Sequence, residues 1–309
     1  MKHLTKMTDL SFDEINSIMK LAFEYKHKFD LGIRTENVLN GKMVAMVFEK
    51  PSLRTKVAFE IATEYLGGTA VYLSNSQILA SGQNIKGRES IPDIARNLER
   101  FSDLILARVY SHSTISDIVK HVKKPVINAL CDRHHPTQAL ADLMAIRWHK
   151  PDIEKLKIAF VGDGNNVAVS LMQICAIAGH DFVFAGPKEY QIPDAAVQAV
   201  QSFTKSSIAI LEEPKDAVTG ADVVYTDTFV SMGQEEEQAK RLEEFSPYQV
   251  DIKMFEMANP GAIFMHCLPA HRGEEVTDEV MDHPRSVIFD QAECRMHIAK
   301  ALLTKFLQS

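Results

Sequence analysis

The sequence is poor in the features that mark several classes of protein. Its four cysteines lie far apart and form no Cys-x-x-Cys pair, so neither a zinc knuckle nor a dense disulfide framework is expected. No apolar run reaches the roughly 18 residues that a membrane span needs. Because 41 acidic side chains outnumber 34 basic ones, no basic surplus is present for binding nucleic acid phosphates. These absences favour a cytoplasmic protein that has free thiols and has neither a nucleic acid nor a membrane as its partner.

The hydrophobic pattern predicts an α/β fold with two domains. Short apolar runs such as 43–48 and 158–161 alternate with segments of helical period, which is typical of parallel sheets flanked by helices. The 309 residues are also about twice the roughly 150 residues of an average domain. A charged, proline-containing stretch over 149–155 separates the two halves. We therefore expect one domain over 1–148 and another over 149–290, linked by two interdomain helices, with a C-terminal helix over 291–309 packing back on the first.

Polar side chains follow the predicted strands, where parallel sheets bind their ligands. After the first strand, Ser52-Leu53-Arg54-Thr55-Lys56 runs into a helix, and the free N–H groups of a helix start together with Arg54 suit an anion. After a later strand, Pro136 fixes a helix start beside His135 and Gln138. From spacing alone, a capping serine with solvated charges and a surface histidine pair explain these two motifs as well.

The second half carries three more loops of this kind. Gly162-Asp163-Gly164-Asn165-Asn166 opens a helix but has two of the three glycines of a dinucleotide fingerprint, so a nicotinamide-dependent oxidoreductase is a weak alternative. The loops 227–234 and 266–275 also follow strands. His266-Cys267 suggests a thiol nucleophile. Neighbouring side chains do not face each other in an extended segment, however, which argues against a covalent mechanism.

In this order, and over nearly the whole chain, the loops resemble the motifs of the aspartate/ornithine carbamoyltransferase family. Ser52-x-Arg54-Thr55-Lys56 resembles the family's carbamoyl-phosphate motif, and His135-Pro136-Thr137-Gln138 resembles its second motif. Asp227 with Ser231-Met232-Gly233, and His266-Cys267-Leu268-Pro269, resemble the two loops that mark the ornithine branch. The aspartate branch is expected to lack both loops, and acetylornithine-type relatives are expected to replace the Ser-Met-Gly loop.

The resemblance implies transfer of the carbamoyl group of carbamoyl phosphate to the δ-amino group of L-ornithine, giving L-citrulline and phosphate. It implies direct attack without a covalent enzyme intermediate, no metal and no cofactor, a homotrimer or a multiple of trimers, and a place in arginine biosynthesis rather than catabolism. The catalytic residues that it implies are Arg54, Arg108, His135, Cys267 and Arg295. Carbamoyl phosphate is expected to contact Ser52, Leu53, Arg54, Thr55, Asn84, Arg108, His135, Gln138, Cys267, Leu268 and Arg295. Ornithine is expected to contact Asn166, Asp227, Ser231 and Met232.

The chain departs from the family pattern in four places. Leu53 replaces a threonine, and Lys56 replaces an arginine. The lysine keeps the positive charge but loses the bidentate hydrogen bonding of a guanidinium group. Asn84 stands where a neighbouring subunit is expected to contribute a glutamine, and Cys294 replaces an asparagine. None of these changes removes an essential donor. A carbamoyltransferase for putrescine or an acylated ornithine, and a non-catalytic binding subunit, are the alternatives. The charged stretch 231–244 is interpreted as a lid, although a solvated helix has the same composition.

Overall fold

The computed structural model describes residues 2–75, 89–203, 205–231 and 235–308, and the chain forms two compact units. Unit 1 consists of Met1–Met144 and Glu293–Ser309, and unit 2 consists of Ala145–Ala292. Both borders fall inside long helices, α6 (Pro136–His149) and α13 (Ile288–Leu307), which link the units. The sequence analysis placed these borders at residues 148 and 290, because a change of composition marks where a helix ends rather than where its packing partner changes.

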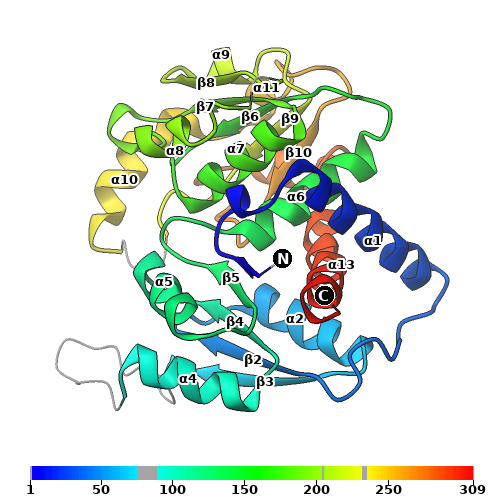
Figure 1. Ribbon diagram of the computed structural model, residues 1–309. Coiled ribbons are helices and arrows are strands. Elements are labelled where there is room, and N and C mark those ends of the chain that lie inside the picture. The colour runs from blue at the N-terminus through cyan, green and yellow to red at the C-terminus, as the bar shows by residue number, and fades with distance from the viewer. Residues whose placement is uncertain (1, 76–88, 204, 232–234, 309) are drawn as a thin grey trace. The chain divides into compact units, whose positions relative to one another are not determined.

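Unit 1 has a five-stranded parallel sheet in the order β1-β5-β4-β2-β3. Its strands are β1 (His3–Leu4), β2 (Met43–Phe48), β3 (Thr69–Ser74), β4 (Leu104–Arg108) and β5 (Val126–Leu130). Its helices are α1 (Phe12–Asp30), α2 (Leu53–Tyr65), α4 (Ile91–Phe101) and α5 (His112–His121), besides the short turn Met7–Asp9. Figure 1 shows α4 and α5 on one side of the sheet and α2 on the other. Both faces are therefore covered, which is why β2 and β4 are buried apolar runs.

Unit 2 repeats the architecture with the strand order β10-β9-β6-β7-β8. Its strands are β6 (Lys157–Val161), β7 (Asp181–Ala185), β8 (Ile208–Leu211), β9 (Val223–Thr226) and β10 (Ile263–His266). Its helices are α7 (Asn166–Ala178), α8 (Asp194–Gln198), α9 (Pro214–Val218), α10 (Gln238–Phe245), α11 (Ile252–Phe255) and α12 (Asp278–Met281), with short turns at Lys188–Tyr190, Glu235–Glu237 and Ser246–Tyr248. The predicted α/β class with two parallel sheets is confirmed.

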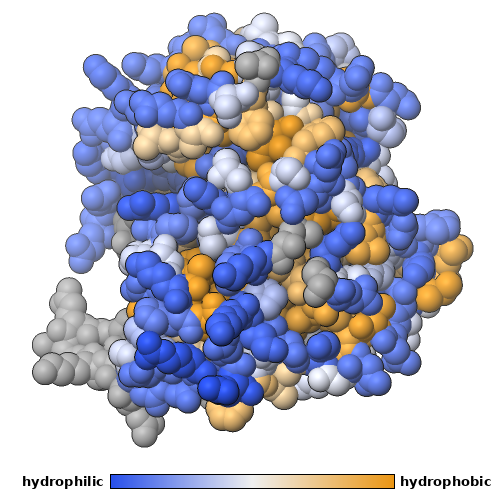
Figure 2. Space-filling model, in the orientation of Figure 1, coloured by the Kyte–Doolittle hydropathy of each residue, from blue (hydrophilic) through white to orange (hydrophobic). Residues whose placement is uncertain are grey.

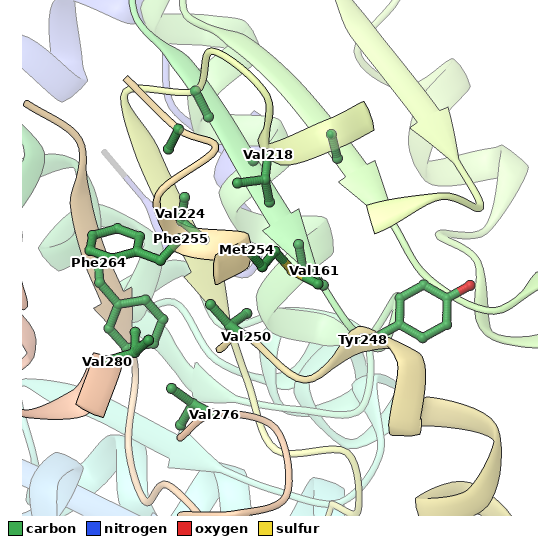
Figure 3. Packing of buried hydrophobic residues seen from close by; sticks show 14 of the residues in the cluster. Val161, Val218, Val224, Tyr248, Val250, Met254, Phe255, Phe264, Val276 and Val280 are labelled. Atoms are coloured by element: carbon green, nitrogen blue, oxygen red, sulfur yellow. The ribbon is translucent and has the colours of Figure 1, made fainter. Parts of the chain in front are cut away.

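The core of unit 2 lies on both faces of its sheet. On one face Phe160 stacks between Phe184 and Tyr225, at centroid distances of 6.0 and 5.3 Å. On the other face Phe264 packs with Phe255 and the residues around it, as Figure 3 shows. The side chains of successive residues in each strand therefore pack on opposite faces of the sheet. This packing on both faces holds the carboxyl ends of the strands in fixed positions.

No helix in the described part of the chain is long and apolar enough to cross a membrane. The face drawn in Figure 2 is largely hydrophilic, with apolar side chains in small groups.

Candidate active site

In unit 1 the candidate residues follow strands at the centre of the sheet. Strand β2 pairs with β3 on one side and β4 on the other, and Phe48 lies beside Arg108 in the register. The chain leaves β2 towards one face and β4 towards the other, so the loops after them diverge at this point (Figure 1). A divergence of this kind is where open parallel sheets bind ligands. It gathers the segment before α2, the end of β4 and the loop after β5.

The start of α2 is fixed by Ser52. Its Oγ accepts a hydrogen bond from the backbone N–H of Thr55 at 3.3 Å, which makes it the N-cap. The side chain of Leu53 is 73% exposed, so this residue has its backbone N–H to offer rather than its side chain. Helix α2 begins here and not at Val57, where the apolar pattern starts. The first turn thus places free N–H groups and Arg54 next to one another.

Arg295 joins three candidate residues from separate segments of unit 1. The guanidinium group is buried and donates hydrogen bonds to Thr55 Oγ1 at 2.9 Å, to Gln138 Oε1, and to His135 Nε2 at 3.4 Å. The amide of Gln138 in turn donates to Asp142 Oδ1 at 2.8 Å. Helix α13 therefore brings Arg295 to the first turns of α2 and α6 and to the loop after β5.

The electrostatics of His135 show how much positive charge this site holds. Burial, and then the guanidinium groups of Arg295, Arg108 and Arg54, hold the pKa of His135 well below its usual value. The imidazole is therefore neutral, and because its Nε2 accepts from Arg295 its proton lies on Nδ1. Three guanidinium groups around a neutral ring, beside a helix start, form a strong site for an anion with several oxygens.

Three of the departures from the family pattern, at Leu53, Lys56 and Cys294, lie within the described residues of unit 1. Lys56 Nζ lies 3.6 Å from Glu60 Oε1 and 4.7 Å from the ring centroid of Tyr72, so its charge is used within α2 and against β3. Cys294 is buried beside Arg295 in sequence. Asn84, and Met232 in unit 2, lie outside the described residues, so the roles expected for them stay predictions.

In unit 2 three loops after strands meet at Asp227, which follows β9 next to β6 at the centre of the sheet. Asp227 Oδ1 accepts from Cys267 Sγ at 3.1 Å and from the N–H of Thr228 at 2.9 Å. Its Oδ2 accepts from Asn165 Nδ2 at 2.9 Å. One carboxylate thus links the loops after β6, β9 and β10.

Asn165 is a residue that the sequence analysis missed. Its Oδ1 caps α7 by accepting from the N–H groups of Val167 and Ala168, and its Nδ2 holds Asp227, whereas the expected ligand Asn166 is the first residue of the helix. An N-cap signal was present, but two successive asparagines made the choice ambiguous. The glycines beside them serve the chain itself: Gly162 has φ +132°, and a side chain at Gly164 would collide with the backbone at Gln191.

The geometry of His266 argues against a thiol nucleophile. His266 Nδ1 accepts from the N–H of Leu268 at 2.8 Å, and its Nε2 donates to the fully buried Glu275 at 3.1 Å. The partner of Cys267 is therefore the carboxylate of Asp227, which does not favour a thiolate. Ligand atoms of Asp227, His266 and Cys267 lie within 4.8 Å of one another, but both nitrogens of His266 are already engaged. The Leu268 side chain packs against the core, and its N–H is bound to His266, so the expected contact of Leu268 with carbamoyl phosphate stays a prediction.

Arg241 on α10 is the second residue that the sequence analysis missed. It is buried, its Nη2 donates to Asp163 Oδ2 at 2.5 Å, and its Nε donates to the carbonyl oxygen of Phe229 at 2.6 Å. The guanidinium group also lies 4.5 Å from the ring of Tyr190. Burial raises the pKa of Asp163 to about 6 even though Arg241 opposes the shift. Arg241 thus fastens the loop after β9 to the loop after β6.

The stretch interpreted as a lid is anchored over much of its length. Residues 238–245 form α10, whose Arg241 and Phe245 are buried, while Gln238, Ala239, Lys240 and Glu243 are exposed. Ser231, a candidate ligand, is half-buried at the start of the stretch. A closing motion stays a prediction, and α10 is not the free solvated helix that its composition allowed.

Comparison with known proteins bears on what these two groups of residues do. Residues 2–148 match the family model described as "Aspartate/ornithine carbamoyltransferase, carbamoyl-P binding domain", and residues 154–306 match its "Asp/Orn binding domain". An ornithine carbamoyltransferase of Bacillus subtilis is 43% identical over 99% of this chain and 94% of its own length. The anabolic ornithine carbamoyltransferase of Pyrococcus furiosus is 46% identical over 98% of this chain and 95% of its own length.

Solved structures agree with these matches. The ornithine carbamoyltransferase structure from Pyrococcus furiosus superposes with a TM-score of 0.92 at 42% identity, covering 100% of this chain and 97% of that one. An N-acetyl-L-ornithine transcarbamylase has a TM-score of 0.87 at 27% identity, over 99% of this chain and 100% of that one. The anion site of unit 1 coincides with the carbamoyl-phosphate-binding half of the family model, and the Asp227 group coincides with the amino-acid-binding half. The chain belongs to the aspartate/ornithine carbamoyltransferase family and is a carbamoyltransferase.

Proposed function

We propose that the protein is an ornithine carbamoyltransferase. The δ-amino nitrogen of L-ornithine attacks the carbonyl carbon of carbamoyl phosphate, and a tetrahedral intermediate forms. The bond from that carbon to the phosphate oxygen then breaks, the leaving phosphate takes up the proton that the nitrogen loses, and L-citrulline and phosphate are released. The reaction proceeds without a covalent enzyme intermediate, and this chain's residues bind, orient and polarise the two substrates.

The observation that carries the proposal is the convergence of Arg54, Arg108 and Arg295 on a buried, neutral His135. Phosphate oxygens bind the first turn of α2 through Ser52, the N–H of Leu53, Arg54 and Thr55. Arg108, Gln138 and Arg295 polarise the carbamoyl oxygen. When that oxygen takes the place of His135 Nε2 as acceptor of Arg295, the ring proton can move from Nδ1 to Nε2, from which the imidazole donates to the carbamoyl oxygen as well. Loss of one such donor typically lowers kcat by roughly 10²–10³.

The acceptor side of the proposal depends on Asp227. An alkylammonium group has a pKa near ~10 and attacks only as the neutral amine, so the site has to bind and deprotonate it. Asp227 lies within hydrogen-bonding distance of Cys267 Sγ, at 3.1 Å, and this pair orients the δ-amino group. Asn166, Ser231 and Met232 bind the α-amino and α-carboxylate groups. Recognition of these groups separates ornithine from putrescine.

The direction of flux and the assembly belong to the same proposal. Two of the similar proteins, from Pyrococcus furiosus and Campylobacter jejuni, are described as anabolic, which supports a role in arginine biosynthesis. We further propose a homotrimer in which Asn84 reaches the site of a neighbouring subunit. Sedimentation equilibrium of the full chain tests the trimer, and a monomer or dimer mass contradicts it.

The test is citrulline formation from carbamoyl phosphate with L-ornithine, beside putrescine, N-acetylornithine and aspartate as acceptors. We expect strong turnover with L-ornithine alone. R54A should raise the KM for carbamoyl phosphate and lower kcat roughly 10²-fold, whereas D227A should mainly raise the KM for ornithine. R96A is a matched control, because Arg96 is an exposed arginine of unit 1 paired with Asp93. Equal loss of both affinities in R54A or D227A contradicts the division of roles, and turnover with another acceptor contradicts the assignment of ornithine.

A further inference from the structure

A hydrogen bond joins the two loops that carry the proposed ornithine contacts. Thr228, in the loop after β9, places Oγ1 at 3.0 Å from Nδ1 of His271, in the loop after β10. Thr228 lies directly after Asp227, and its own N–H donates to Asp227 Oδ1 at 2.9 Å. His271 is 47% exposed, so core packing does not account for its position. The contact connects segments that are 43 residues apart.

The direction of this hydrogen bond follows from the single proton of the Thr228 hydroxyl. The hydroxyl donates that proton to the carbonyl oxygen of Val230 at 3.0 Å. It therefore accepts from His271, whose proton lies on Nδ1. Val230 directly precedes Ser231, so the hydroxyl fixes the turn that presents Ser231. His271 in turn fixes the rotamer of the hydroxyl.

The loop that carries His271 is held by hydrogen bonds to Glu275. The backbone N–H of His271 donates to Glu275 Oε1 at 2.5 Å, and the same oxygen accepts from His266 Nε2 at 3.1 Å. Glu275 is fully buried, and its Oε2 lies 3.8 Å from Nδ1 of His271 without a hydrogen bond in the described structure. The carboxylate thus places negative charge on the side of the ring where Nδ1 carries its proton.

The turn between His271 and Glu275 has its own anchors. Gly273 adopts φ +91°, a conformation that favours glycine, and its N–H donates to the carbonyl oxygen of Val276 at 2.8 Å. Arg272 forms ion pairs of 2.7 Å with Asp278 and with Asp282. His271, Glu274 and Glu275 also bring one nitrogen and two carboxylates within 4.8 Å, but a metal on Nδ1 would displace the hydrogen bond to Thr228.

We propose that His271 is a positioning residue for ornithine binding, acting through Thr228 on the turn that leads from Asp227 to Ser231. It does not touch the substrate. Its N–H holds the Thr228 hydroxyl, the hydroxyl holds Val230, and the turn then presents Asp227 and Ser231 in the geometry that binds the amino acid. This inference rests on the proposed function and assigns a residue on which ornithine affinity depends.

The experiment is a double-mutant cycle on full-length protein, with KM for each substrate and kcat as readouts. We expect H271A and T228V each to raise the KM for ornithine about five- to tenfold, the range expected for one net hydrogen bond. The KM for carbamoyl phosphate and kcat should change less than about twofold. H271N should restore affinity, because an asparagine amide offers an N–H near the place of Nδ1, and T228S should keep it. The double variant should bind ornithine no more weakly than T228V, because T228V already removes the hydroxyl through which His271 acts.

The control is T219V, which removes a threonine hydroxyl of unit 2 that donates to the carbonyl oxygen of Lys215 at 2.7 Å within α9 and its C-terminal end. Urea unfolding of every variant separates loss of folding from loss of affinity, and T228S and H271N keep the test sound if the larger changes unfold the protein. An unchanged KM for ornithine, equal loss of both affinities, additive losses or failure of H271N to restore binding each overturn the inference. Wild-type protein that does not use ornithine overturns the proposed function instead, so the two failures are distinguishable.

Discussion

Protonation of His180 should weaken unit 2 in mild acid. This histidine follows Gly179 at the end of α7 and is 5% exposed. Its Nδ1 accepts from the N–H of Leu156 at 3.4 Å, so that nitrogen has to stay unprotonated for the contact to persist. Burial, with a contribution from Arg147, lowers the pKa of His180 to about 4. In the unfolded chain the same ring takes up a proton near ~6.5.

The sign and size of the effect follow from these two values. Between pH 6.5 and 4 the unfolded chain binds more protons than the folded chain, so the free energy of unfolding falls as the pH falls. For a pKa of about 4 in the folded state and ~6.5 in the unfolded state, linkage gives a loss of about 2 kcal/mol between pH 7 and pH 5. The contribution is fully present above pH 7.

The assay is urea unfolding at pH 7 and pH 5, followed by the fluorescence of Trp148. Trp148 is the single tryptophan of the chain and lies in unit 2, as His180 does. H180N is the matched variant, because its Oδ1 can accept from Leu156 but cannot be protonated in this range. We expect the stability of H180N to depend less on pH than that of the wild type, by about 2 kcal/mol, with unchanged m-values. Equal dependence on pH in the two proteins refutes the reasoning.

Two predictions concern the packing of unit 2. R241M leaves Asp163 buried without its cation and should lower the free energy of unfolding by about 3–5 kcal/mol, whereas D163N/R241M should lie closer to wild type, as a double-mutant cycle of urea unfolding will show. A loss in the double variant equal to the sum of the single losses contradicts the pairing. F264A, in the cluster of Figure 3, should cost about 3–5 kcal/mol in the same assay, and a loss below 1 kcal/mol would mean that the cluster repacks.

Much of the fold could be predicted because both sheets are parallel and covered on both faces. Strands such as β2 and β6 then appear as continuous apolar runs, and their order along the chain places loops at the same edge. β1 has two residues and gives no periodic signal. The apolar pattern of α2 begins only at Val57, so the start of this helix at Leu53 is indicated by the polar motif from Ser52 to Lys56 and not by hydrophobic periodicity.

The residues of the candidate site could likewise be predicted only in part. Arg54 and His135 could be proposed from loops that follow strands, whereas Arg108 and Arg295 were proposed from the family resemblance, and the structure brings the four residues together. Arg241 could not be predicted as a site residue, because it lies in a charged run of the sequence and nothing in that run indicates that its side chain is buried. Its burial depends on Asp163 and Tyr190, which are distant in the chain. The link between Thr228 and His271 depends likewise on the register of neighbouring strands, since β9 and β10 pair directly and end together.

The discontinuity of unit 1 has a consequence for the order in which the protein is made. Arg295 and the rest of α13 beyond Glu293 belong to unit 1 but are synthesised after the whole of unit 2. Unit 2 is therefore a continuous segment that can fold while the ribosome is still synthesising the chain. Unit 1 cannot complete its folding until its last helix has been synthesised. The guanidinium group that joins Thr55, His135 and Gln138 arrives in that last segment. A nascent chain thus has no complete anion site until translation has passed both units.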